Sequence, residues 1–402
     1  MKIVVDANIP LANEFFSRLG DVTLIPPREL STDNVKDADV LVVRSVVKID
    51  KHLLENSKVK FVGSCTAGVD HLDTDYMDQN NIVWSGAPGC NANAVVEYVL
   101  SALAALSLEK NIDWWNKSVG IIGCGNVGSR LYKRLTAFGL SCQVYDPLLS
   151  ENACPEKIDD NFTSLENVLS NDIVCVHAPL THHAVFPSFH LLGEKELSCL
   201  PENVILISAG RGAVIDNQAL LSFLKGRRDI TAVLDVWEDE PLIPDELLHL
   251  VNLATPHIAG HSYDGKALGT EIIYNKLCGF LNVSPDVTFS DFDSAPKKII
   301  TLTRKHNLNS QINEAILLAH DVRDDDNQLR SELAKIGTED LEKRKDLFDS
   351  LRKNYKKRRE FSNCLIELSS NLSAISKPKI DSVVDLATKL QVLGFNIKRI
   401  AD

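Results

Sequence analysis

The chain has 402 residues, and at roughly 150 residues per domain this length predicts two or three domains rather than one small one. Its 43 Lys and Arg against 55 Asp and Glu give a formal net charge of −12, which argues against a general nucleic-acid binder and against a binder of anionic membranes. Hydrophobic residues at 44% and charged residues at 24% are ordinary globular values, so we do not expect wholesale disorder.

Targeting and redox signals are weak. Residues 1–6 contain three consecutive apolar residues before an acid, too few for a signal peptide, so we expect a first strand and a cytoplasmic protein. The most apolar long stretch, residues 94–108, carries Glu97 and is too short to span a bilayer. Nine cysteines without a Cys-x-x-Cys pair favour reduced thiols over a zinc site or a disulfide framework.

Short apolar, mostly β-branched runs recur in the first part of the chain, with helix-compatible segments between several of them. The runs are Ile3–Val5, Val22–Ile25, Val40–Val43, Phe61–Gly63 and Ile82–Trp84. Alternating strands and helices predict a parallel sheet covered on both faces. From Ala94 an i, i+3, i+4 apolar stripe predicts one long amphipathic helix that separates this block from the next.

A second block of apolar runs follows that helix, and its six predicted strands suit a complete dinucleotide-binding sheet. The runs are Val119–Ile122, Cys142–Tyr145, Ile173–Val176, Val204–Ile207, Thr231–Leu234 and Asn252–Ala254. After about residue 283 the sequence becomes more charged. Helical patterns over 310–329, 338–355 and 381–393, with apolar runs at 364–368 and 395–400, predict a small α+β C-terminal domain.

A glycine motif, Gly123-Cys-Gly125-Asn-Val-Gly128, follows the first strand of the second block and opens a helix. Such glycines permit a tight turn, close approach of backbone N–H groups to a pyrophosphate, and close packing of helix on strand. Asp146, at the end of the next strand, can accept hydrogen bonds from ribose hydroxyls. Residues 147–149 offer no cation for a 2′-phosphate, so the sequence favours NAD over NADP; the alternative is a structural turn.

Arg211, Glu240 and His257 each lie in a polar cluster that follows a predicted strand. Because ligands bind at the carboxyl ends of the strands in an open parallel sheet, we expect these clusters to converge. Arg211 can clamp a carboxylate with two hydrogen bonds and polarise the adjacent carbonyl. His257 can take a hydroxyl proton as hydride leaves, while Glu240 would orient the ring and stabilise the imidazolium.

Each of these residues alone has a structural alternative: a surface ion pair for Arg211, a helix N-terminal charge for Glu240 and a loop histidine for His257. Their joint position at successive strand ends favours a catalytic site. The pair His182-His183 suggests a metal. Without a third ligand at a suitable spacing a solvated loop is the better interpretation, and we expect no metal.

These motifs, together with Asp235 before Val-Trp-Glu, resemble those of the D-isomer-specific 2-hydroxy acid dehydrogenases. Further segments narrow the resemblance to the branch of that family that oxidises 4-phospho-D-erythronate, on a route to pyridoxal phosphate. These segments are residues 42–45, 61–71, 87–92, 95–98 and 351–355. The resemblance covers nearly the whole chain, and the C-terminal part is its most discriminating portion.

The resemblance implies an α/β architecture in which a Rossmann NAD-binding domain is inserted into a flavodoxin-like substrate-binding domain. Residues 1–93 and 260–285 would form the split substrate-binding domain, and residues 94–259 the NAD-binding domain. Residues 286–402 would form a C-terminal dimerisation domain and make the protein a homodimer.

The resemblance also implies individual roles. Arg211, Glu240 and His257 would be catalytic, with His257 the acid/base, and Ser45 and Thr66 would contact the substrate. As isolated residues, Ser45 and Thr66 are equally well explained as turn hydroxyls. NAD contacts would come from the glycine motif and the strand ends, namely Gly123, Gly125, Asn126, Val127, Gly128, Asp146, Ala178, Ala209, Gly210, Asp235 and Gly260.

Two positions depart from the family pattern. His261 stands where the family usually has tyrosine, so an imidazole replaces a hydroxyl donor to the substrate. The segment 177–179 reads His-Ala-Pro instead of the usual His-Thr-Pro, which removes a hydroxyl near NAD and leaves the backbone groups of Ala178. Neither departure touches the catalytic residues.

A phosphorylated substrate needs cations. Arg44, beside Ser45, is one candidate, with a structural ion pair as the alternative. The other lies in a basic run over residues 341–360, which holds nine Lys and Arg against four acids. Most such runs are solvated helix faces, but Arg352 could reach the phosphate in the partner subunit's cleft.

We therefore expect NAD-dependent oxidation of a small anionic phosphorylated hydroxy acid, with two domains that close over the cleft near residues 91–94 and 260. Two other classes stay open: a dehydrogenase of another D-2-hydroxy acid such as D-3-phosphoglycerate, and a non-enzymatic NAD-sensing scaffold. The C-terminal part argues against both, because it resembles neither an amino-acid-sensing regulatory domain nor a disordered interaction tail.

Overall fold

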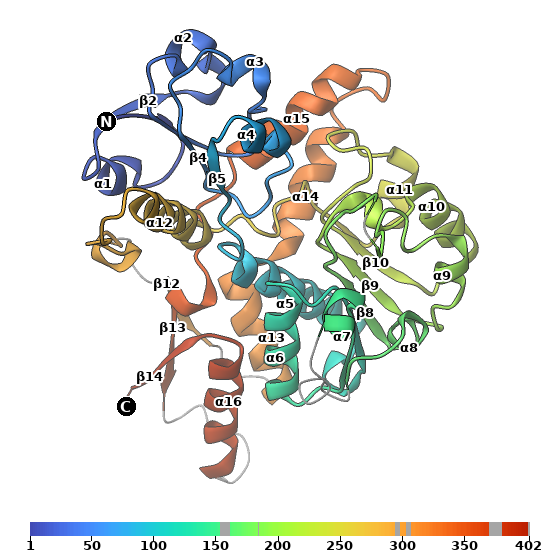
Figure 1. The fold of residues 1–402 in the computed structure, drawn as a ribbon. Coiled ribbons are helices and arrows are strands. Elements are labelled where there is room, and N and C mark those ends of the chain that lie inside the picture. Colours follow the sequence, from blue (N-terminus) through green and yellow to red (C-terminus); the bar gives the residue numbers. More distant parts are fainter. Residues whose placement is uncertain (153–160, 184, 294–297, 303–306, 370–379, 401–402) are drawn as a thin grey trace. The chain divides into compact units, whose positions relative to one another are not determined.

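Figure 1 shows the computed structural model, which describes residues 1–152, 161–183, 185–293, 298–302, 307–369 and 380–400. The chain forms two compact units. Residues 1–93 and 261–296 make up the first, and residues 94–260 and 297–402 make up the second. The C-terminal residues thus belong to the same compact unit as the second sheet. The eight described cysteines are free, and Cys154 lies outside the described residues.

The first unit is built on a five-stranded parallel sheet with the order β2-β1-β3-β4-β5. Its strands are β1 (Lys2–Asp6), β2 (Asp21–Ile25), β3 (Val40–Val43), β4 (Phe61–Ser64) and β5 (Val83–Ser85), and its short helices are α1 (Ala12–Phe16), α2 (Thr32–Val35), α3 (Lys51–Leu54) and α4 (Thr74–Gln79). β3 is buried along its whole length, which is why it appears as an unbroken apolar run. The strand order is the flavodoxin-like one, so this prediction is confirmed.

Helix α12 (Tyr263–Phe280) returns the chain to the first unit and packs on β4. Gly63 of β4 makes room for it, because a Cβ at that position would collide with Cγ2 of Ile273. Ser262 caps the helix by accepting a hydrogen bond from the N–H of Gly265 at 2.8 Å. The first unit is therefore discontinuous in the sequence.

The second unit contains the six predicted strands as one parallel sheet with the order β11-β10-β9-β8-β6-β7. The strands are β6 (Val119–Ile122), β7 (Cys142–Tyr145), β8 (Ile173–Val176), β9 (Ile205–Ser208), β10 (Thr231–Leu234) and β11 (Leu253–Ala254). β7 lies on one side of β6, and β8 to β11 follow in order on its other side, so the strand order reverses between β6 and β8. In open α/β sheets this switch point is where a crevice for ligands forms, at the carboxyl ends of the strands.

Helix α5 (Ala92–Lys110) is the long helix predicted from the apolar stripe, extended at both ends. It is long and apolar enough to cross a membrane, but most of it is buried inside the protein. Its side chains belong to the hydrophobic core of the second unit, together with those of β6 and of α6 (Gly128–Phe138). α5 is therefore a core helix.

The C-terminal residues form helices and strands, as expected, within the second compact unit. These elements are α13 (Leu308–Ala319), α14 (Val322–Leu333), α15 (Leu341–Lys353), α16 (Ile380–Val392) and the parallel strands β12 (Lys298–Thr301), β13 (Cys364–Ser369) and β14 (Asn396–Ile400). The single helical pattern expected over 310–329 is interrupted, because His320 is extended and the side chain of Asp321 caps α14. The apolar runs in this part of the sequence also did not predict the four-residue strand β12.

The C-terminal helices cover parts of the six-stranded sheet of the second unit. Ile312 and Ile316 of α13 share one core with Leu103 of α5. From α14, Asp326 accepts a hydrogen bond from the N–H of Ala254 in β11 at 2.7 Å, and Arg330 donates to the carbonyl of Val251 at 3.0 Å. The edge strand β11 is therefore held by α14.

Removal of residues 286–402 tests this dependence. We expect the truncated protein to be insoluble or monomeric, because α5 and β11 lose the side chains that cover them. Size-exclusion chromatography beside the full chain is the measurement. A soluble truncated dimer would contradict the dimerisation role assigned to these residues.

Candidate active site

The glycine motif forms the turn between β6 and α6, and each glycine meets a different constraint. Gly123 has a φ of +88°, and a Cβ there would lie 2.6 Å from the backbone N of Ala178. A Cβ at Gly128 would collide with the carbonyl oxygen of Gly123. At Gly125 a Cβ would meet no described atom within 4 Å. That open position lets a pyrophosphate approach the N–H groups at the start of α6.

Asp146 follows β7 and contacts the glycine turn. One carboxylate oxygen accepts a hydrogen bond from the N–H of Cys124 at 2.8 Å, and the other accepts from the N–H of Leu149 at 3.2 Å. The next side chains are apolar, with Leu148 and Leu149 exposed. An acid that is followed directly by apolar residues fits free ribose hydroxyls and repels a 2′-phosphate, so this position fits NAD.

The ends of β8 and β9 close against the same turn. A Cβ at Gly210 would lie 3.1 Å from the carbonyl oxygen of Ala178, and Ala178 and Ala209 are both buried. Both ring nitrogens of His177 are buried as well, and this burial lowers its pKa to about 4, so its ring is neutral at pH 7. Small residues at these positions let three strand ends meet at the switch point.

His257 and Glu240 form a hydrogen-bonded pair. Nδ1 of His257 lies 2.6 Å from Oε1 of Glu240, and each side chain is 26% exposed. Since a carboxylate only accepts hydrogen bonds, Nδ1 carries the proton and Nε2 is left as a base. Burial alone raises the pKa of Glu240, but the hydrogen bond with His257 and the charges of His257 and Arg352 lower it overall. Glu240 is therefore ionised near neutral pH and can stabilise an imidazolium.

Asp235 holds the loop that carries His257. Its carboxylate is 1% exposed and accepts hydrogen bonds from the Thr255 hydroxyl at 2.6 Å and from the N–H groups of Ile258 and Ala259 at 2.7 and 2.9 Å. Burial raises its pKa, and the charge of His257 and these hydrogen bonds oppose the rise. The structure thus gives Asp235 a positioning role, and its contact with NAD stays a prediction.

The loop that carries Arg211 is fastened to the loop that carries Glu240. A Cβ at Gly212 would collide with the backbone of Trp237, so the two loops are in direct contact. Oε2 of Glu238 accepts a hydrogen bond from the N–H of Asn217 at 3.0 Å. Arg211, Glu240 and His257 therefore follow the adjacent strands β9, β10 and β11, as expected.

The ring of His190 also joins these loops. Its Nε2 lies 2.6 Å from Oε1 of Glu238, and its Nδ1 lies 3.6 Å from Oδ2 of Asp216. Sequence reasoning missed His190, Gly212, Asn217 and Glu238 as parts of the site. Gly212, Asn217 and Glu238 could have been found because they lie close in sequence to Arg211 or Glu240. His190 lies on an earlier loop and had no such signal.

The expected substrate contacts Ser45 and Thr66 lie in the first unit, after the adjacent strands β3 and β4. Ser45 is exposed. Oγ1 of Thr66 lies 2.8 Å from Oγ of Ser64 and donates to the carbonyl of Gly68 at 3.1 Å. The hydroxyl of Thr66 therefore has a structural task in its turn, and the substrate contact of both residues stays a prediction.

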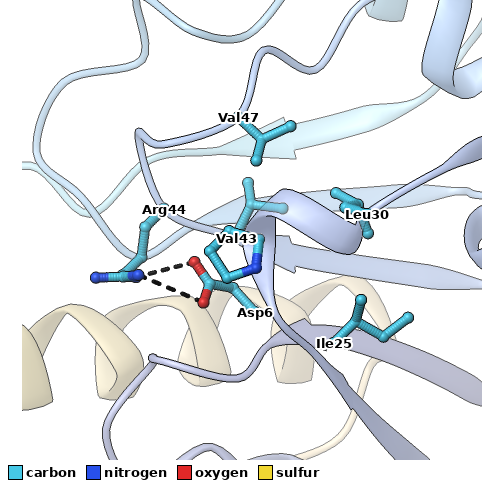
Figure 2. Close-up of a pocket in the computed structure, with 7 residues that line it drawn as sticks. Asp6, Ile25, Leu30, Val43, Arg44 and Val47 are labelled. Carbon is cyan, nitrogen blue, oxygen red and sulfur yellow. Dashed lines mark hydrogen bonds and ion pairs between the residues drawn. The ribbon is translucent and has the colours of Figure 1, made fainter. Parts of the chain in front are cut away.

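Arg44 is paired with Asp6 at the carboxyl ends of β3 and β1 (Figure 2). Its Nε donates to Oδ2 of Asp6 at 2.9 Å and its Nη2 to Oδ1 at 3.4 Å. Ile25, Leu30 and Val47 line the same small pocket. The geometry favours the structural ion pair for Arg44, because its charge is neutralised by a buried acid.

The remaining candidates lie in the C-terminal part and where the chain leaves the second unit. Gly260 is the last residue of that segment of the second unit, and His261 begins the next segment of the first. The guanidinium of Arg352, in α15, lies 5.6 Å from the ring centroid of Phe348, and its charge acts on Glu240 of the same chain.

Several other cations of the basic run are engaged in ion pairs within the chain. Lys343 pairs with Asp340 at 2.6 Å, and Lys356 pairs with Asp325 at 2.9 Å. Arg344 pairs with Asp245. The pattern is that of helix faces with local ion pairs rather than one anion site.

Comparison with known proteins places these features in a family. Residues 106–259 match the model of the D-isomer specific 2-hydroxyacid dehydrogenase, NAD binding domain, and residues 292–377 match a domain of unknown function. The erythronate-4-phosphate dehydrogenase of Cellvibrio japonicus is 47% identical over 93% of this chain and 97% of that protein. That of Marinomonas sp. is 43% identical over 92% of this chain and 96% of that protein.

Among solved structures, NAD+-bound 3-phosphoglycerate dehydrogenase from Entamoeba histolytica matches with a TM-score of 0.60. It is 24% identical and covers 71% of this chain and 98% of its own, which shows a shared fold. The expected NAD cofactor and Rossmann fold are thereby confirmed.

Gly212→Ala tests whether contact between the Arg211 loop and the Glu240 loop sets the geometry of the candidate site. The added Cβ pushes the backbone of Trp237 away, and we expect kcat/KM to fall roughly 10- to 100-fold, since small misplacements of catalytic groups are costly. The matched control is Gly226→Ala at the end of α10 (Asn217–Gly226), where the Cβ meets no described atom within 4 Å. Wild-type kinetics for Gly212→Ala would contradict the interpretation.

The lowered pKa of Glu240 predicts the direction of a pH effect on stability. Because the folded-state pKa lies below the ordinary 4.5, the ionised side chain stabilises the fold above that pH and loses this effect as the pH falls through the lowered pKa. We expect Glu240→Gln to reduce the free energy of unfolding at neutral pH by on the order of 1 kcal/mol. Urea unfolding at several pH values should show the difference shrinking in acid. A constant difference would count against the pairing.

Proposed function

Because the chain belongs to the family of erythronate-4-phosphate dehydrogenases, we propose that it oxidises 4-phospho-D-erythronate with NAD to (R)-3-hydroxy-2-oxo-4-phosphobutanoate. The observation that carries the proposal is the His257–Glu240 pair, 2.6 Å apart, on loops that are fastened to the Arg211 loop. An acid/base, a carboxylate-binding cation and a dinucleotide site are the groups that oxidation of a 2-hydroxy acid needs.

In the proposed reaction Arg211 clamps the substrate carboxylate with two hydrogen bonds and polarises the C2 oxygen. Nε2 of His257 takes the proton of the C2 hydroxyl, and Glu240 stabilises the imidazolium that forms. Bound NAD supplies the acceptor for the C2 hydride. The glycine turn, Asp146 and the ends of β8 and β9 would hold it at the switch point.

The first unit would supply substrate contacts through Ser45 and Thr66, at the ends of β3 and β4. We infer that the two units close over the substrate, because exclusion of water strengthens the hydrogen bonds to a reacting carboxylate and hydroxyl. His261 would take the place of the usual tyrosine at the substrate.

The substrate phosphate would need a cation in addition to Arg211. Arg352 is supported by its charge, which acts on Glu240 of the same chain, and the alternative is Arg352 from the partner subunit. Arg44 is the weaker candidate, because it would have to leave Asp6. The homodimer through the C-terminal domain, the cytoplasmic location and the role in pyridoxine biosynthesis are part of the same proposal and rest on the family.

Two alternatives would use the same residues. A dehydrogenase of another D-2-hydroxy acid, such as D-3-phosphoglycerate, would share the catalytic residues, and a non-enzymatic NAD-sensing scaffold would share the proposed NAD site. The C-terminal domain favours the first proposal over both alternatives. Its match extends over residues 292–377, beyond the part of the chain shared with other 2-hydroxy acid dehydrogenases.

Arg211→Ala and His257→Ala test the mechanism. We expect both variants to fold and bind NAD, while turnover of 4-phospho-D-erythronate falls roughly 10²- to 10⁴-fold, because each removes a group that acts on the reacting carbons. The control is His249→Ala, an exposed histidine of α11 (Asp245–Leu250). NADH absorbance reports turnover, and preserved turnover in either catalytic variant would overturn the mechanism.

A further inference from the structure

The side chain of Arg358 lies at both points where the chain passes between the two units around the catalytic loop. These passages lie between residues 93 and 94 and between residues 260 and 261. Nη2 of Arg358 donates to the carbonyl oxygen of Ala94 at 2.8 Å and to that of Ala259 at 2.7 Å. Because one nitrogen reaches both oxygens, the two connecting segments are held next to each other at the edge of the second unit.

Arg358 differs from the surface cations of the basic run. It is 4% exposed, and two acids near it are also buried: Glu97 of α5 at 1% and Glu360 at 5%. Burial and the charge of Glu360 raise the pKa of Glu97, whereas the charges of Arg134 and Arg358 lower it. A buried guanidinium is costly unless its charge is balanced and its donors are paired. Among the described residues Nε and Nη1 of Arg358 have no hydrogen-bond partner, so the two carbonyls bound by Nη2 are the contacts that hold the side chain in place.

The contact with Ala259 links Arg358 to the catalytic loop. The N–H of Ala259 donates to the buried carboxylate of Asp235 at 2.9 Å, and its carbonyl accepts from Arg358. His257, two residues earlier, has a φ of +54°, a backbone conformation that a non-glycine residue keeps only when its surroundings hold it. Asp235 and Arg358 therefore hold the two sides of the same residue, and Arg358 binds the carbonyl that leads out of the loop.

We propose that Arg358 is a positioning residue for the dehydrogenase reaction: it ties the two connecting segments together, and so sets the hinge for closure and the backbone after His257. The inference rests on the proposed function. It gives the C-terminal domain a task within its own subunit, in addition to dimerisation. The contact lies outside the glycine turn, so we expect NAD affinity to change less than turnover.

Arg358→Met, which keeps the length of the side chain and removes its donors, is the test in the full-length protein. We expect kcat/KM for 4-phospho-D-erythronate to fall roughly 10-fold or more, with the Kd of NAD changed less than about twofold. Arg358→Lys keeps a charge and donors with a shorter reach and should restore part of the rate. The control Arg228→Met removes an exposed arginine of the same unit and should leave the kinetics unchanged.

Hydrogen exchange gives a readout that needs no turnover. In Arg358→Met we expect faster amide exchange over residues 92–98 and 255–262 and unchanged exchange in the glycine turn. This separates failure of the inference from failure of the proposed function. Normal kinetics together with unchanged exchange in those segments would overturn the inference. If Arg358→Met does not fold, Arg358→Lys provides the test instead. Wild-type rates and wild-type exchange in this variant would overturn the inference, whereas intermediate rates and faster exchange over residues 92–98 and 255–262 would support it.

Discussion

The carboxylate of Asp235 is buried at the end of β10 and fixes the backbone on which the proposed acid/base depends. It accepts three hydrogen bonds, from the Thr255 hydroxyl and from the N–H groups of Ile258 and Ala259. An unpaired carboxylate in this position would be costly, and the donors offset that cost only when the loop is in place. The left-handed backbone at His257 and the fold of its loop are therefore linked, so the imidazole is oriented before any substrate arrives.

The rest of the second unit serves to bring neighbouring strand ends to this carboxylate. Glycines and alanines after β6, β8 and β9 let the strand ends approach closely, and Gly212 brings the Arg211 loop against Trp237. Two C-terminal residues hold this region in place: Asp326 accepts a hydrogen bond from Ala254 in β11, and Arg358 donates one to Ala259, at the end of the loop that carries His257. The C-terminal residues thus help to hold the loop that carries His257, in addition to providing the proposed dimer contact.

Much of this was visible in the sequence because it depends on local patterns. Apolar runs located the strands of both large sheets, and the glycine motif with Asp146 predicted the cofactor. Contacts between distant segments were not visible, since nothing near Arg44 indicates that Asp6 neutralises it, and nothing near residue 358 distinguishes that buried arginine from its exposed neighbours. The break at His320 was missed because the helical sequence pattern continues through it. The hydrogen bond by which the Asp321 side chain caps α14 starts a new helix at this point.

Initial rates of NADH formation by the full-length protein with 4-phospho-D-erythronate, D-3-phosphoglycerate and unphosphorylated D-erythronate compare the candidate activities directly. With the Arg211, Glu240 and His257 site and a phosphate-binding cation in place, kcat/KM should be highest for 4-phospho-D-erythronate. D-erythronate lacks the phosphate, and D-3-phosphoglycerate is one CHOH group shorter and cannot place its carboxylate and its phosphate at the same spacing, so we expect a preference of roughly 100-fold or more over the first and roughly 10-fold or more over the second. If the protein holds NADH tightly, NADH formation can be too slow to see, so NADH consumption in the reverse reaction with the 2-oxo acid is measured as well. Preference for D-3-phosphoglycerate, or no turnover in either direction, would contradict the account.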